Sequence, residues 1–126
     1  MEYDLNYCTL QRWGDDIVLI EIKDGIEVNA DMAAELINIA NKNLNGSFGI
    51  LSNRVNSYSL SFEAMAALAQ HDNLAAVAIV VPSSRSRLLV EAQNYLISAI
   101  KKKPIKVFLD TDSASNWLKS TLQSTD

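Results

Sequence analysis

The run of apolar residues from Leu74 to Val81 constrains the fold more than any other segment of the chain. Its apolar residues occupy consecutive positions, whereas a strand with one face in water would alternate apolar and polar residues. The run is also far shorter than the roughly 20 apolar residues that cross a membrane. We therefore expect a central strand that is covered on both faces, which is typical of α/β proteins.

The segments on either side of this strand alternate between strand and helix patterns. At the N-terminus, a strand pattern, a turn from Trp13 to Asp16 and a β-branched run predict an antiparallel hairpin. The strands are expected at residues 3–9, 17–22, 48–51, 74–81 and 104–109, and the helices at residues 29–44, 61–69, 88–100 and 110–122. This β-β-α-β-α-β-α-β-α order predicts one α/β domain over residues 1–126, with a mainly parallel sheet after the hairpin.

Side chains that suit helix N-caps stand at the start of three of the expected helices. Asn29 and Ser61 are the candidates for the first two, and one of Asp110, Thr111 and Asp112 is the candidate for the last. These positions fix where each helix begins.

Polar connections follow the expected parallel strands at residues 52–61, 82–87 and 110–113. The C-terminal ends of parallel strands meet at one edge of a sheet, together with helix N-termini, and ligands and partners are held there. We therefore expect the binding residues on these connections. The candidates for contact with a partner or ligand are Asn53, Arg54, Asn56, Ser57, Tyr58, Ser59, Arg85 and Arg87.

The arginines have two interpretations each. Arg54 follows a buried strand, so its guanidinium reaches either solvent or an acceptor, and its fork fits a carboxylate or phosphate. Arg85 and Arg87 oppose the dipole of the helix they begin, which indicates a surface for acidic groups. Pairing of these two side chains with Asp110 or Asp112 explains them equally well.

Tyr58 and the serines beside it are also ambiguous. Tyr58 is either an exposed anchor for a partner or a ring folded over the helix edge. Ser59 and Ser61 are candidate phosphoacceptors, because a phosphate at a helix N-terminus is favoured by free N–H groups and the dipole. Capping and turn chemistry also account for serine at these positions.

The sequence offers little for catalysis. His71 and Asp72 form the one candidate acid-base pair, and adjacency in sequence does not make their side chains face each other. The single Cys8 cannot form an intramolecular disulfide, and no metal-ligand spacing or glycine-rich phosphate loop is present. We expect a protein that is not an enzyme and that uses no metal or cofactor.

Charge and composition narrow the class of partner. A net charge of -4 argues against nucleic-acid binding. Without a secretory signal or transmembrane segment, the expected location is the cytoplasm. A free strand edge near Tyr3, Tyr7 and Trp13 predicts a homodimer. The expected partner is therefore another protein or a second copy of the chain.

Local motifs add a family resemblance. Phe108-Leu109-Asp110 ends a strand and runs into a helix with Ala114 and Trp117-Leu118, and a polar loop follows the strand at residues 48–51. This layout resembles the STAS domains, in particular the SpoIIAA-like branch related to anti-sigma-factor antagonists. The resemblance implies a non-catalytic regulatory domain that docks on a partner protein through the loop and helix after the third strand.

In the antagonist branch a Ser or Thr at the start of the second helix is phosphorylated. Ser59 or Ser61 is the nearest counterpart here, although the segment Ser57-Tyr58-Ser59-Leu60-Ser61-Phe62 has neither the Asp nor the Gly of the switch motif. Related domains sense small ligands. The alternative function is therefore binding of a small anionic or amphipathic ligand, a lipid or nucleotide, near Arg54 and Arg85.

Overall fold

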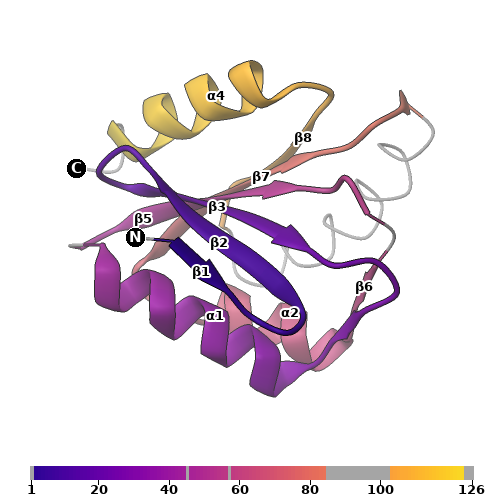
Figure 1. Cartoon of the computed structure of the whole chain (residues 1–126). Helices are drawn as coiled ribbons and strands as arrows, with labels where there is room; N and C mark the ends of the chain where they lie inside the picture. Colours follow the sequence, from indigo (N-terminus) through magenta and orange to yellow (C-terminus); the bar gives the residue numbers. More distant parts are fainter. Residues whose placement is uncertain (1, 45, 57, 85–102, 124–126) are drawn as a thin grey trace.

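A six-stranded sheet runs through the centre of the molecule, in the order β1-β2-β3-β5-β7-β8 (Figure 1). The computed structural model describes residues 2–44, 46–56, 58–84 and 103–123, without the side chains at positions 62, 65 and 69. The strands are β1 (Glu2–Asp4), β2 (Cys8–Trp13), β3 (Ile17–Ile22), β5 (Phe48–Asn53), β7 (Leu74–Val80) and β8 (Ile105–Phe108). The first two pairings are antiparallel and the other three are parallel, which confirms the predicted α/β class and its N-terminal hairpin.

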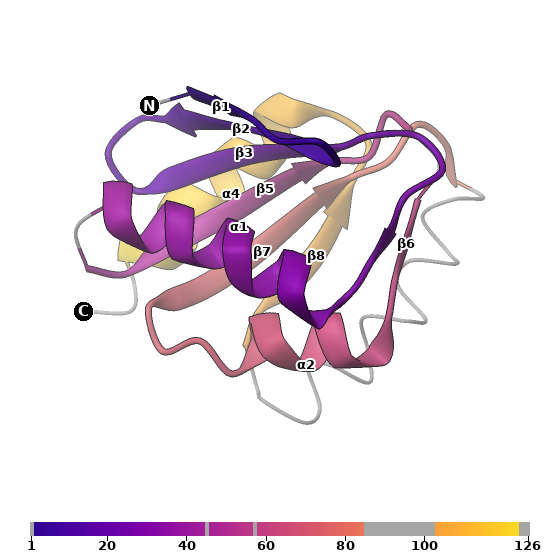
Figure 2. The same cartoon turned by 60° about the horizontal axis from the view of Figure 1, so that its bottom comes forward.

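Helices cover both faces of this sheet. Figures 1 and 2 show α1 (Ala30–Asn43) and α2 (Phe62–Ala69) on one face and α4 (Thr111–Gln123) on the other. On the face of α4, Ala76, Ala78 and Val80 of β7 pack in one cluster with the buried side chains of the helix. Gly49 lets α4 approach closely, since a Cβ atom there would lie 3.0 Å from Cδ2 of Leu118. The expectation of a central strand covered on both faces is confirmed.

None of the helices in the described ranges is long and apolar enough to cross a bilayer. The expected helix at residues 88–100 lies outside the described residues.

The expected N-caps are confirmed, and the cap of α4 is Asp110. In each case a side-chain oxygen accepts a hydrogen bond from a backbone N–H in the first turn, which satisfies a donor that the helix leaves free. The bonds run from Met32 N to Asn29 Oδ1 (2.9 Å), from Ala64 N to Ser61 Oγ (3.0 Å) and from Ser113 N to Asp110 Oδ1 (2.7 Å).

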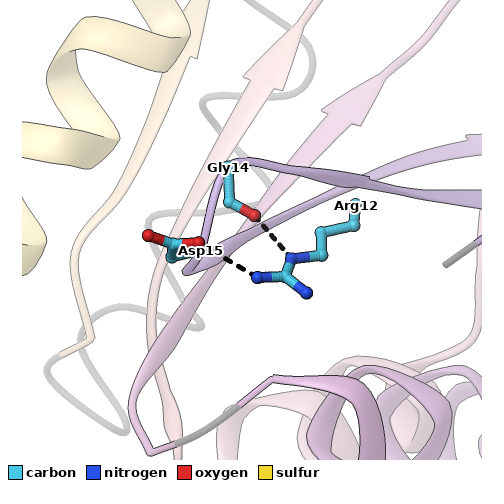
Figure 3. A network of polar contacts seen from close by, with 3 residues as sticks. All are labelled: Arg12, Gly14 and Asp15. Carbon is cyan, nitrogen blue, oxygen red and sulfur yellow. Dashed lines mark hydrogen bonds and ion pairs between the residues drawn. The ribbon is translucent and has the colours of Figure 1, made fainter.

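The turn between β2 and β3 lies at residues 14–16, where Gly14 has a φ of 79°. That left-handed conformation favours glycine. Arg12 closes the turn: its Nε donates to the carbonyl of Gly14 at 2.7 Å, and its Nη2 donates to Asp15 Oδ1 at 3.0 Å (Figure 3). The turn precedes β3, so it lies at the N-terminal edge of the parallel strands.

The first strand differs from the prediction. Residues 3–9 do not form one strand, because the chain bends after β1 and Leu5 N donates to the carbonyl of Cys8 at 2.8 Å. β1 therefore folds back along β2. Tyr3 and Leu5 still pack against the core cluster that contains Tyr7. The alternating apolar residues therefore reach the core although the strand is interrupted. Tyr7 is buried and its hydroxyl bonds to the Glu35 carboxylate, which removes it from the free strand edge.

A second, two-stranded sheet was not expected. β4 (Glu27–Val28) pairs in parallel with β6 (Ser59–Leu60), just before α1 and α2 begin. The pair fastens the connection after β5 to the connection after β3. Strands this short carry no readable periodicity, which is why the sequence patterns did not reveal them.

Candidate functional site

The ends of the parallel strands form one edge, as expected. Arg54 N, just past β5, donates to the carbonyl of Val80 at 2.8 Å, and Val81 N, just past β7, donates to the carbonyl of Phe108 at 2.9 Å. The connections after β5, β7 and β8 therefore start side by side. We call residues 54–56, 81–84 and 109–110 the rim.

Arg54 is held against Tyr58. Its Nη2 donates to the Tyr58 carbonyl at 2.7 Å, and its Cζ lies 4.5 Å from the centroid of the Tyr58 ring. The Tyr58 hydroxyl in turn bonds to the Ser52 hydroxyl at 3.0 Å. Among the described residues no carboxylate forms an ion pair with Arg54. The guanidinium is half-exposed and has further N–H donors with which an anion can be bound.

The two asparagines fix the loop. Asn53 Nδ2 donates to Glu21 Oε2 at 2.8 Å, on the opposite face of the sheet from Arg54. Asn56 Nδ2 donates to the carbonyl of Ile22 at 3.0 Å. The two bonds tie the end of β5 and the connection after it to the end of β3.

The two candidate phosphoacceptors have different surroundings. Ser61 Oγ is the N-cap of α2, whereas the side chain of Ser59 is exposed on β6. The backbone N–H of Ser59 donates to the carbonyl of Ile26 at 3.0 Å, which holds the residue in place. Of the other predicted site residues, Ser57, Arg85 and Arg87 lie outside the described residues.

An apolar cavity lies behind the connection after β5, between the sheet and the helices α1 and α2. It has a volume of about 70 Å³. Three polar residues of one segment, Ser52, Arg54 and Tyr58, line it together with aliphatic side chains from the sheet, both helices and β6. The aliphatic residues are Ile20, Ile22, Leu36, Ile50, Leu60, Leu68, Val77 and Ile79.

The sequence patterns did not reveal this cavity, because its lining comes from six different elements and the connection after β5. One signal was present: Ser52 follows Phe48 and Ile50 on the same face of β5, so a hydroxyl stands where the alternation calls for an apolar side chain.

Val55 and Leu109 are the two large hydrophobic side chains exposed in the described part of the chain, at 60% and 49%. Val55 follows Arg54, and Leu109 follows the last residue of β8, so both belong to the rim. Neither was among the predicted site residues. For Val55 the available signal was an apolar residue inside a polar connection, whereas Leu109 falls at the end of the expected strand at residues 104–109.

A cysteine nucleophile would need a histidine base beside it, but Cys8 and His71 do not meet. Cys8 is fully buried and pairs with Ile22 at the end of β3. His71 comes before β7, at the opposite edge of the sheet, where its backbone carbonyl accepts a bond from Lys103. The length of the strands, roughly 20 Å, separates the two side chains. In the described ranges no group of three His, Cys, Asp or Glu side chains is placed to hold a metal.

Comparison with protein families shows to which family the chain belongs. A family described as a domain of unknown function, DUF7793, matches residues 11–122. The chain belongs to the DUF7793 family. No curated protein matches this DUF7793 chain.

Comparison with solved structures concerns the fold of the DUF7793 chain. It is similar to the crystal structure of an uncharacterised protein of the DUF3478 family from Shewanella loihica PV-4, which has a SpoIIAA-like fold. The two share 17% sequence identity with a TM-score of 0.58, over 94% of this chain and 98% of the other. This likeness confirms the predicted SpoIIAA-like fold, and at this identity it concerns the fold alone.

Proposed function

We propose that this DUF7793 chain is a non-catalytic, STAS-like domain that docks on another protein through the rim. The observation that carries the proposal is the exposure of Val55 and Leu109 at the same edge of the sheet. Their strands flank β7, so the connections that carry the two side chains begin about 10 Å apart. Interfaces combine an apolar centre with polar and charged groups around it. Arg54 supplies such a charge directly beside Val55.

The chemistry of the rim indicates the kind of partner. Arg54 has no carboxylate paired with it among the described residues, so a partner that places an acidic side chain next to an apolar one would satisfy both features. In a twofold dimer through the rim, the copy would offer Arg54 only the residues of the same patch. The one carboxylate of the rim, Asp110, already accepts bonds from Ser113 N at 2.7 Å and from Ser113 Oγ at 2.9 Å as the cap of α4. Charge therefore favours a different protein over a second copy.

The proposal does not include catalysis. Cys8 is buried, and it lies at the opposite edge of the sheet from His71. The SpoIIAA-like fold supports the same conclusion, because the STAS domains that this chain resembles act by docking.

Phosphorylation of Ser59 is a further part of the proposal. Its exposed side chain follows Tyr58, whose carbonyl accepts a bond from Arg54. A phosphate would add a charge of about -1.5 to -2 next to the guanidinium and would compete with the acidic group of the partner. Ser61 is a poorer candidate, because its hydroxyl oxygen is engaged as the cap of α2.

Two substitutions on the rim test the docking surface. Val55→Asp and Leu109→Asp each place a carboxylate in the apolar part of the rim, and Ser47→Asp adds the same charge at an exposed position on the opposite edge. All three side chains are exposed, so unfolding free energies should change by no more than about 0.5 kcal/mol.

Proteins captured by the wild-type chain would be identified by quantitative mass spectrometry, purified, and titrated against the variants. The rim variants should weaken binding of the same purified partner by at least about tenfold, and Ser47→Asp should not. Wild-type affinity in both rim variants would contradict the proposal. Self-association that is lost in the rim variants would show that the partner is a second copy.

A further inference from the structure

The cavity behind the rim has the composition of a binding site for an amphipathic molecule. Eight aliphatic side chains form most of its lining. In the described part of the lining, polar groups occur along one segment, where Ser52 of β5 and Arg54 just past it follow Ile50 on the same face and Tyr58 joins them. A ligand that fits must therefore be apolar at one end and polar at the other.

The volume limits the size of the apolar end. An apolar cavity of about 150 Å³ in another protein holds one benzene ring. The cavity here measures about 70 Å³. It therefore encloses an aliphatic group of roughly three to five carbons, which is only a part of the chain of a membrane lipid.

The charge of the site determines which polar group the ligand should carry. Among the described residues of the lining Arg54 is the one cation, and one of its N–H groups is used by the Tyr58 carbonyl. The remaining donors can form two parallel bonds to a carboxylate. A phosphate dianion would keep an uncompensated charge next to this single cation, whereas a carboxylate matches it. The stacked Tyr58 ring holds the guanidinium in position before any ligand arrives.

We propose that the cavity binds a short-chain aliphatic carboxylate, with its hydrocarbon end among Ile50, Leu68 and Val77 and its carboxylate on Arg54. This small-molecule site shares Arg54 with the docking surface, but neither Val55 nor Leu109 lines the cavity. A ligand with about seven non-hydrogen atoms should bind with a Kd on the order of 1 mM.

Titration with 3-methylbutanoate, followed by backbone amide shifts in NMR, tests this site. We expect saturable shifts that centre on Ser52, Arg54 and Tyr58. The uncharged analogue 3-methylbutanamide should bind at least about tenfold more weakly, because it cannot accept charge-assisted bonds from both N–H groups. Butyl phosphate should also bind more weakly, and octanoate should gain nothing from its longer chain.

Variants separate the charge from the cavity. Arg54→Gln should weaken binding of 3-methylbutanoate by at least about tenfold, whereas Arg12→Gln, which removes the same charge at the opposite edge, should leave it unchanged. Val77→Phe fills the cavity and should abolish binding. If Val77→Phe does not fold, Leu60→Phe at the half-exposed side of the lining serves the same purpose.

Absence of saturable shifts up to about 20 mM would overturn the proposal, since that concentration exceeds the expected Kd by more than tenfold. Equal binding by the amide, or unchanged binding in Arg54→Gln, would overturn it as well. Leu109→Asp, which adds its carboxylate on a different connection of the rim, should bind 3-methylbutanoate like the wild type. A failure of the docking surface and a failure of this site are therefore distinguishable.

Discussion

The position of Arg54 gives its side chain two proposed roles, as the charge of the docking surface and as the cation of the cavity. It lies at the end of β5, so its backbone N–H continues the pairing with β7 while its side chain crosses the ring of Tyr58. The sequence predicted an arginine that reaches solvent, a salt bridge or a partner. It did not indicate the stacked geometry, because Tyr58 is four positions away and the loop between them has no regular pattern.

Cys8 allows a prediction at the same scale. Burial is the main cause that raises the pKa of the Cys8 thiol from 9.0 to about 11. At pH 8 roughly one thiol in a thousand is then ionised in the folded protein, compared with about one in ten in the unfolded chain. A disulfide reagent such as dithionitrobenzoate should label Cys8 slowly in native buffer and rapidly in denaturant.

The same pKa shift has a consequence for stability. The thiol ionises more readily in the unfolded chain, so the unfolded state releases its proton first as the pH rises. The free energy of unfolding should therefore be unaffected by this group below pH 9 and should fall as the pH rises from about 9 towards 11. If the reagent labels Cys8 at pH 8 as fast in native buffer as in denaturant, the result would contradict the burial of Cys8.

At the scale of elements, Ser61 and Ser59 form a matched pair. Ser61→Ala removes the side-chain acceptor of the Ala64 N–H and should lower the free energy of unfolding by about 1 kcal/mol. Ser59→Ala changes an exposed hydroxyl on β6 and should have no measurable effect. Urea unfolding followed by circular dichroism measures both. Equal losses in the two variants would mean that Ser61 does not cap α2.

The sequence predicted the elements whose apolar residues recur at a regular spacing or that begin at a recognisable cap. Apolar spacing predicted the strands β3, β5, β7 and β8, and cap chemistry predicted the N-caps Asn29 and Ser61. The bend after β1 and the pair of β4 with β6 depend on tertiary contacts over two or three residues. Such short segments carry no periodic signal, so the sequence could not show them.

At the scale of the whole molecule, topology determines where function can lie. The parallel strands bring three connections to one edge, and this much was predictable from the alternation of strands and helices. The contents of that edge were only partly predictable. Exposure makes Val55 and Leu109 available for contact, and packing brings the cavity lining together. The order of residues along the chain shows neither exposure nor packing.

The most direct test of the account is site-specific photo-crosslinking from the rim. A photoreactive phenylalanine would replace Val55, Leu109 or, as a control at the opposite edge, Ser47. With the purified partner, we expect crosslinks from both rim positions to the same segment of that protein and none from Ser47. Crosslinks from Ser47 with none from Val55 and Leu109 would contradict docking through the rim.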